Sequence, residues 1–448
     1  MGWHGACLFL GVRIVSFVVF AVVFVSNVSA QSGAPSGAAA APFATTSDSP
    51  PQSPPARGAL TQITVDQALA IAEQNSPLLR EGQAVIDAGQ ARIQTARAYT
   101  NPTIEFLAGH QKALAVPLPG PPGTLQHYSV VQPIEVPAER RLRIHAATLG
   151  LVADRHLAAG VRLAVMANVK RAFYDVIRRK EQLSNAKSNL DLVQDLRRRV
   201  EVEVNVGEKG RLELTRAEAE LSRARAVVTS AEIELAAARA SLKAATGMPS
   251  AETPDPVGVL DQQVQLAPLN NLRQQLLADH PALSEAQSRA AQAHTVVADE
   301  RARRVPQPSL YGEYEHQPDL SFYRLGVSVS IPLWDRRSGK IHEAEAEATR
   351  SEAVRRQREL ELTAALERAY DQYQISKEQV VSLQAGSLRE AEAAVDAAQA
   401  AYRFGERGIV EVLDAQRVLQ GVRTDLLDAL YARQTALIDL EELGVIHP

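Results

Sequence analysis

The chain has 448 residues, a formal net charge of −4 and a single cysteine. This charge gives no indication of nucleic-acid binding, and one cysteine excludes a disulfide framework within the chain. Aromatic residues make up only 5% of the chain, while Ala, Leu, Glu, Arg and Gln are abundant, which is typical of long helices.

Residues 1–30 are predicted to be an export signal. Arg13 precedes an apolar run at residues 14–25, and Val28-Ser29-Ala30 has the small-x-small pattern of a cleavage site. A membrane anchor is the alternative, but the run is shorter than the roughly 20 residues of a spanning helix. Cys7 lies before the run, where a lipoprotein signal would not place it. We therefore expect a mature chain with no lipid anchor, thiolate metal site or thiol catalysis.

Residues 31–60 are rich in Pro, Ala and Ser. Such a segment lacks the apolar surface that would offset the entropy lost on ordering. It is predicted to be a disordered linker.

The rest of the chain is predicted to be an internal duplication, with a first repeat at 61–255 and a second at 265–448. Three pairs of matched segments support this prediction. Asn75-Ser-Pro77 recurs 204 positions later as Asp279-His-Pro281, and Ile134 recurs 197 positions later as Ile331. Gly207-Glu-Lys-Gly210 recurs 198 positions later as Gly405-Glu-Arg-Gly408. An inserted loop at residues 111–126 explains the fall in the offset. Each repeat is expected to contain a helix, two strands, a very long helix, a Gly-x-x-Gly break and another long helix.

Four strands are predicted, at about 102–110, 126–135, 308–316 and 322–332. Apolar residues alternate with polar or small ones, as in Tyr323-Arg-Leu-Gly-Val-Ser-Val-Ser-Ile331. In a soluble domain the apolar face would rest on a core, whereas in a membrane barrel it meets lipid and the polar face lines water. Strands of about ten residues match an outer-membrane crossing. Since four strands cannot close a barrel, several chains would have to share one.

The helices before the two breaks are predicted at about 139–206 and 337–404. Each would be about 100 Å long if unbroken, too long for a compact globule. The last helix of each repeat carries a heptad seam of large and small apolar residues, in which Arg433 is the exception. The helices alone would also fit an elongated coiled-coil rod.

This duplicated plan resembles the TolC-type outer-membrane factors, the outer membrane efflux protein family. The most specific match is Tyr402-x-x-Gly405-x-Arg407-x-Ile-Val-Glu411-Val-Leu-Asp414-Ala415. The resemblance implies a mainly α fold with a small β part, in a homotrimer in the outer membrane of a Gram-negative bacterium. Long coiled-coil helices would form a periplasmic α-barrel, and four strands per chain would contribute to a 12-stranded transmembrane β-barrel surrounded by outer-membrane lipid.

Two further segments, 132–144 and 332–341, look more like the CzcC-like subset, which serves heavy-metal cation pumps of the resistance-nodulation-division class. The resemblance then implies a passive exit duct of a tripartite efflux pump. Its partners would be a periplasmic adaptor (a membrane fusion protein) and an inner-membrane resistance-nodulation-division transporter. A duct for drugs or other small organic molecules remains an alternative. A periplasmic coiled-coil adaptor or a structural protein is the alternative from a different class.

The resemblance places the periplasmic gate at Tyr402, Arg407, Glu411 and Asp414. Three-fold symmetry would repeat Glu411 and Asp414 as two stacked anionic rings, which favour cations. Arg407 stands four residues before Glu411 and could pair with it within the helix or reach a neighbouring helix. Ordinary solvated charges near a turn are the alternative.

The two glycine breaks are expected to project as tips that dock the adaptor. They comprise Gly207, Glu208, Lys209 and Gly210 in the first repeat, and Gly405, Glu406, Arg407 and Gly408 in the second. Glycine permits the tight reversal between helices. In the first repeat the positions equivalent to the gate are Lys209, Glu213 and Arg216, which lack the second acid, so the first hairpin is not expected to gate.

No enzyme activity, cofactor or metal site is expected. His342-Glu343 lacks the second histidine of a metalloprotease helix, and no Gly-rich phosphate loop is present. The histidines at 110, 127, 145, 316 and 342 show no ligand spacing. His110 and His127 flank the inserted loop and could touch an exported metal, although such histidines more often face solvent.

Overall fold

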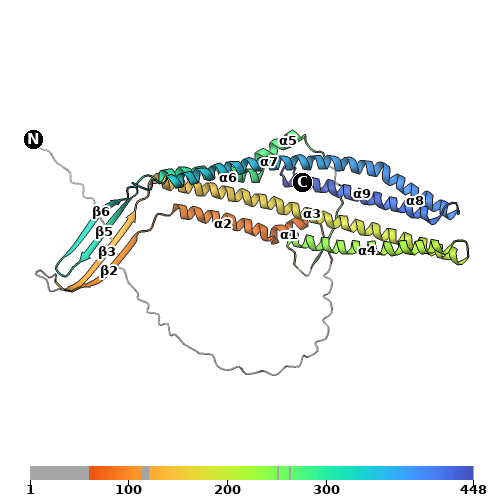
Figure 1. Ribbon diagram of the computed structural model, residues 1–448, viewed down its shortest axis with the longest axis horizontal. Helices are drawn as coiled ribbons and strands as arrows, with labels where there is room; N and C mark the ends of the chain where they lie inside the picture. Colours follow the sequence, from red (N-terminus) through yellow and green to blue (C-terminus); the bar gives the residue numbers. More distant parts are fainter. Residues whose placement is uncertain (1–59, 113–120, 250–251, 262–263, 447–448) are drawn as a thin grey trace, which may run out of the picture. The chain divides into compact units, whose positions relative to one another are not determined.

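The computed structural model describes residues 60–112, 121–249, 252–261 and 264–446. The predicted export signal lies outside the described residues, and so do the predicted linker up to residue 59 and the central part of the inserted loop. Figure 1 shows how the described elements are arranged.

The same order of helices and strand pairs occurs twice, and the first repeat also contains the short strands β1 and β4. The first repeat contains β1 (Leu60–Ile63), α1 (Val65–Asn75), α2 (Pro77–Arg97), β2 (Thr103–Gln111), β3 (Gly123–Pro133), α3 (Pro137–Asn205), α4 (Arg211–Thr246) and β4 (Thr253–Pro256). The second contains α5 (Leu269–Asp279), α6 (Pro281–Ala302), β5 (Pro308–His316), β6 (Ser321–Val329), α7 (Ser338–Ser382), the π-helical turn η1 (Leu383–Ser387), α8 (Leu388–Arg403) and α9 (Ile409–Glu442).

A proline divides the entry helix of each repeat in two. Pro77 and Pro281 stand at the first position of α2 and α6, where a missing backbone N–H leaves no hydrogen bond unmade. The residue before Pro281 caps α6, because His280 Nδ1 accepts a hydrogen bond from the N–H of Ala282 at 3.1 Å. Burial lowers the pKa of His280, which favours the neutral ring whose Nδ1 can accept. The repeated Asn/Asp-x-Pro motif is thus a local helix break.

The four predicted strands form one antiparallel sheet in the order β2-β3-β5-β6. Each repeat supplies one hairpin, and the hairpins join where β3 pairs with β5. A row of aromatic residues crosses the sheet on one face, in which each member is directly opposite the next: Phe106, Tyr128, Tyr314 and Tyr323. Ile104 and Leu325, on the same face, are 75% and 84% exposed. One face of the sheet is therefore apolar and uncovered by the described chain.

The inserted segment lengthens the first hairpin, which corrects its interpretation as a loop throughout. β2 continues to Gln111 and β3 begins at Gly123, and these two residues pair. Residues 123–126 follow the last of the prolines in this segment, so each has the backbone N–H that strand pairing requires.

The long helices pack side by side. α3 contacts α2, α4, α6 and α9, and α7 contacts α6 and α9. Asp154 of α3 is 1% exposed and accepts from Arg92 of α2 at 2.5 Å and from Arg289 of α6 at 2.8 Å. A buried carboxylate with two guanidinium partners is costly to unpair. It links helices of both repeats.

Arg433, the exception in the heptad seam of α9, is buried as an ion pair. It is 1% exposed and donates to Asp261 at 2.5 Å. Apolar seam residues around it, such as Ala429, Ala436 and Leu440, are buried as predicted.

The helix predicted over about 337–404 is present from Ser338 to Arg403, but it contains a π-helical turn. Residues 383–387, Leu-Gln-Ala-Gly-Ser, form the π-helical turn η1 between α7 and α8. An i→i+5 turn accommodates one extra residue within a helix. The corresponding helix of the first repeat, α3, runs through 69 residues without such a turn.

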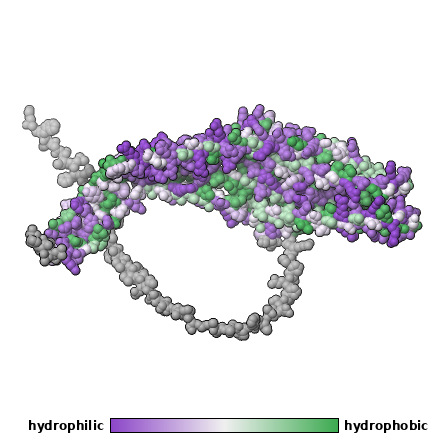
Figure 2. Space-filling view, viewed as in Figure 1, coloured by the Kyte–Doolittle hydropathy of each residue, from purple (hydrophilic) through white to green (hydrophobic). Residues whose placement is uncertain are grey.

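Within the described residues, none of the helices combines the length and the hydrophobicity that a membrane span requires. Figure 2 shows hydrophilic residues over much of the helical part and hydrophobic patches among the strands.

Candidate functional site

The α3–α4 and α8–α9 turns are built in the same way. Gly207 and Gly405 adopt positive φ angles of 83° and 74°. The N–H of Glu208 donates to the carbonyl of Glu203 at 2.9 Å, and the N–H of Glu406 makes the equivalent bond. This is the Schellman motif, in which a glycine at the left-handed position ends the helix without a Cβ clash. Both Gly-x-x-Gly segments are therefore helix ends followed by immediate reversals.

The two turns lie at the same end of the helices, away from the four-stranded sheet (Figure 1). Glu208, Glu406 and Arg407 are exposed and Lys209 is half-buried. Among the residues that the structure describes, Arg407 forms no ion pair. The two tips thus expose charged side chains.

Just above the tips, an apolar cluster joins two helical hairpins, one formed by α3 and α4 and the other by α8 and α9. Its members come from α3, α4, α8 and α9, and they are Leu196, Val200, Ala217, Tyr402, Ile409, Val412 and Leu413. Burial of such side chains contributes about 25 cal/mol per Å². The hairpins are held together here by hydrophobic contact.

Tyr402 carries a polar contact at the edge of this cluster. Its ring is 6% exposed, and its hydroxyl donates to Glu203 Oε2 at 2.5 Å. Lys209 Nζ lies 5.4 Å from the ring centroid, within cation–π range. Burial, and then the carboxylates of Glu203 and Glu213, raise the pKa of the Tyr402 hydroxyl. The hydroxyl therefore remains a donor to Glu203.

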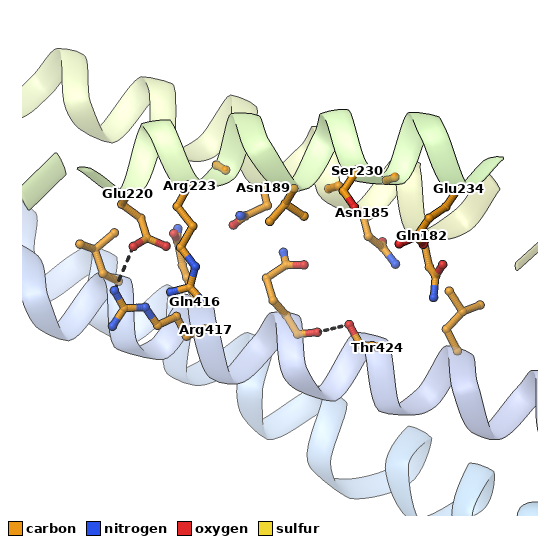
Figure 3. Close-up of a pocket in the computed structure, with 17 residues that line it drawn as sticks. Gln182, Asn185, Asn189, Glu220, Arg223, Ser230, Glu234, Gln416, Arg417 and Thr424 are labelled. Carbon is orange, nitrogen blue, oxygen red and sulfur yellow. Dashed lines mark hydrogen bonds and ion pairs between the residues drawn. The ribbon is translucent and has the colours of Figure 1, made fainter. Parts of the chain in front are cut away.

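A second polar contact joins the hairpins further from the tips. Arg417 of α9 donates to Glu220 of α4 at 2.9 Å and to Asp414 at 3.1 Å. Figure 3 shows Arg417 and Glu220 pointing toward each other across the space between the helices. The guanidinium is half-exposed, so this bridge is a solvent-screened contact.

The predicted gate residues do not form one cluster. Arg407 lies in the turn before α9 begins at Ile409, so the predicted pairing with Glu411 within one helix is wrong. Glu411 is exposed in the first helical turn, and Asp414 is bound to Arg417. Tyr402 is the one predicted gate residue that bridges the hairpins. Its partners Glu203 and Lys209 belong to the α3–α4 hairpin, and no motif in the sequence marks them as gate residues.

A polar groove of about 460 Å³ separates α9 from α3 and α4 beyond the Arg417 bridge. Amide side chains gather along it from facing helices, as Figure 3 shows for Gln182, Asn185, Asn189 and Gln416. Gln416 is 4% exposed, and its amide has no hydrogen-bond partner among the described residues. A buried amide without a hydrogen-bond partner destabilises the packing of the helices around it.

The model of the outer membrane efflux protein family matches residues 68–248 and again residues 272–444. The chain belongs to the outer membrane efflux protein family. The two matches fall on the two repeats.

Curated relatives of this efflux protein include two metal-resistance proteins. The cobalt-zinc-cadmium resistance protein CzcC of Cupriavidus metallidurans is 26% identical over 379 residues, which is 84% of this chain and 88% of CzcC. The nickel-cobalt-cadmium resistance protein NccC of Alcaligenes xylosoxydans xylosoxydans is 26% identical over 313 residues, 69% of each chain.

The crystal structure of CusC, whose study describes transmembrane channel formation, matches this efflux protein with a TM-score of 0.74 and 21% identity, covering 85% of this chain and 91% of CusC. The match shows that the fold is shared. Its family makes this chain an outer-membrane efflux protein, so the alternatives of a periplasmic adaptor or a structural rod do not apply.

Proposed function

We propose that this channel is the passive exit duct for divalent heavy-metal cations in a tripartite efflux pump. The observation that carries the proposal is the similarity over most of the chain to CzcC, a cobalt-zinc-cadmium resistance protein. NccC, a nickel-cobalt-cadmium resistance protein, supports the same class of cargo. No catalytic step is needed for transport through a duct.

The working unit in this proposal is a homotrimer. The four-stranded sheet has two free edge strands, β2 and β6, and pairing these edges between three chains would close a barrel of twelve strands. The apolar face with the row Phe106, Tyr128, Tyr314 and Tyr323 suits contact with lipid, since aromatic girdles mark the membrane interfaces of such barrels. The polar face would then line the duct.

The gate in this proposal is the junction between the two hairpins near their tips. The bond from Tyr402 to Glu203 and the bridge from Arg417 to Glu220 hold α8 and α9 against α3 and α4. Breaking these bonds would free the second hairpin to move outward. Glu411 and Asp414 would add anionic rings in the trimer.

The tips are proposed to dock the partner proteins. Gly207, Glu208, Lys209 and Gly210 form one tip, and Gly405, Glu406, Arg407 and Gly408 form the other. Their exposed charges suit a polar, reversible contact with a periplasmic adaptor, through which an inner-membrane resistance-nodulation-division transporter would deliver the cargo.

Metal tolerance after gene deletion tests the cargo. We expect the deletion strain to lose tolerance to Co²⁺, Zn²⁺ or Cd²⁺, and the wild-type gene to restore it. Organic antibacterial compounds are the matched comparison. Unchanged metal tolerance with a loss of tolerance to organic compounds would replace the metal duct by a drug duct.

A further inference from the structure

A histidine and two glutamates from different repeats meet on the polar face of the sheet. His127 lies on β3, and Glu313 and Glu315 lie on β5. In the strand register His127 is directly opposite Glu315, and Ser129 is opposite Glu313. Because directly opposite residues share a face, all three side chains point to the same side.

The three groups have the geometry of a metal-ligand set. His127 Nδ1 is 3.4 Å from Glu313 Oε1, and one ligand atom from each residue lies within 4.8 Å of the others. Zinc binds His nitrogen and carboxylate oxygen at about 2.0–2.2 Å, so neighbouring ligand atoms of a tetrahedral site are about 3.3 Å apart. Small side-chain rotations would bring the set to that spacing.

The cluster lies on the polar face, opposite the aromatic row. Its side chains are partly covered, with exposures of 27% for His127, 15% for Glu313 and 25% for Glu315. His110 and His316 lie on the apolar face, since they occupy the alternate positions of their strands. Among the strand histidines, His127 alone faces the side proposed to line the duct.

Arg324 of β6 would compete with a bound cation for the carboxylates of Glu313 and Glu315. Its Nη2 lies 2.5 Å from Glu313 Oε1 and 3.8 Å from Glu315 Oε2. The side chain is 56% exposed, so it can swing into solvent when a cation takes its place. An exposed ion pair of this kind costs little to break.

We propose that His127, Glu313 and Glu315 form a transit site for a divalent transition-metal cation. One nitrogen and two carboxylate ligands suit Zn²⁺ or Co²⁺, with water completing the coordination. Three ligands and a competing guanidinium make a weak site, from which an ion can leave again, as conduction requires. The inference rests on the proposed metal duct only for the identity of the ions that reach the site.

Zn²⁺ binding to the purified full-length protein in detergent tests the site. Competition with a chromogenic zinc chelator gives the affinity. We expect His127→Gln and Glu313→Gln to weaken binding by more than the roughly 10- to 100-fold that the loss of an outer-shell partner costs. His316→Gln, a histidine on the other face of β5, is the matched control and should leave the affinity unchanged.

Arg324→Gln keeps all three ligands and removes the competitor, so it should tighten binding by roughly up to fivefold. The site is refuted if His127→Gln binds Zn²⁺ like the wild type, if His316→Gln loses binding equally, or if Arg324→Gln weakens binding. These results do not depend on transport: a Zn²⁺-binding protein whose deletion leaves metal tolerance intact would refute the metal duct and keep the site.

Discussion

The hydroxyl of Tyr402 donates a hydrogen bond of 2.5 Å to Glu203, a residue 199 positions earlier in the chain. The bond joins α8 of the second repeat to α3 of the first. It lies at the edge of the apolar cluster that packs the two hairpins together. The ring that carries this hydroxyl is 6% exposed.

Tyr402→Phe should favour the open channel. The substitution keeps the ring in the cluster and removes only the donor, and a hydrogen bond to a charged group contributes about 1.5–3 kcal/mol. We expect larger single-channel conductance in planar bilayers and a higher open fraction. Tyr370→Phe, in a different cluster, is the control and should conduct like the wild type. A Tyr402→Phe channel with wild-type conductance would remove Tyr402 from the gate.

Opening should also respond to alkaline pH. The buried hydroxyl of Tyr402 has a raised pKa, whereas an exposed tyrosine in the open state titrates near 10. The protonated Tyr402 hydroxyl therefore stabilises the closed state fully below about pH 10. This stabilisation relative to the open state is lost as the pH rises further. Conductance recorded from pH 8 to 11 should rise only at the alkaline end, and this rise should be absent in Tyr402→Phe.

Glu411 should influence cation selectivity more than Asp414. Arg417 lies 3.1 Å from Asp414 and offsets its charge, while Glu411 has no ion-pair partner among the described residues. Reversal potentials in a salt gradient should show a larger loss of cation preference for Glu411→Gln than for Asp414→Asn. The double variant should remain a trimer with the lowest selectivity. Wild-type selectivity in the double variant would exclude the acidic rings.

Loss of Asp261 should destabilise the fold more than loss of Arg433, its ion-pair partner in the seam of α9. Asp261→Asn leaves the guanidinium of Arg433 buried without its counter-ion, which costs up to about 3–5 kcal/mol in enclosed pairs and less here, because Asp261 is half-exposed. Arg433→Leu restores the apolar seam and should be nearly neutral. Thermal unfolding in detergent measures both. A larger loss for Arg433→Leu would show that the arginine itself holds the helices.

The sequence predicted the features that depend on local periodicity. Alternation in segments such as Tyr323–Ile331 identified the strands, and the doubled Gly-x-x-Gly breaks identified the tips. Matched motifs in the two halves led to the family, which the comparison with known proteins confirmed. These features are visible because each lies within a few residues of the chain.

Contacts between the repeats could not be predicted in this way. Glu203 stands in a charged stretch where nothing distinguishes it from its neighbours, and only the packing of the hairpins brings it to Tyr402. The cluster around His127 depends on the register between β3 and β5, which belong to different repeats. Spacing along the chain therefore did not reveal it.

The π-helical turn η1 determines where the side chains beyond it point. An i→i+5 turn takes up one more residue than an α-helical turn. Each residue of α8 is therefore rotated by about 100° about the helix axis from the direction it would have if η1 were α-helical. The buried residues of α8 are Ala391, Val395 and Tyr402. With an α-helical turn at residues 383–387, the Tyr402 hydroxyl would point away from Glu203.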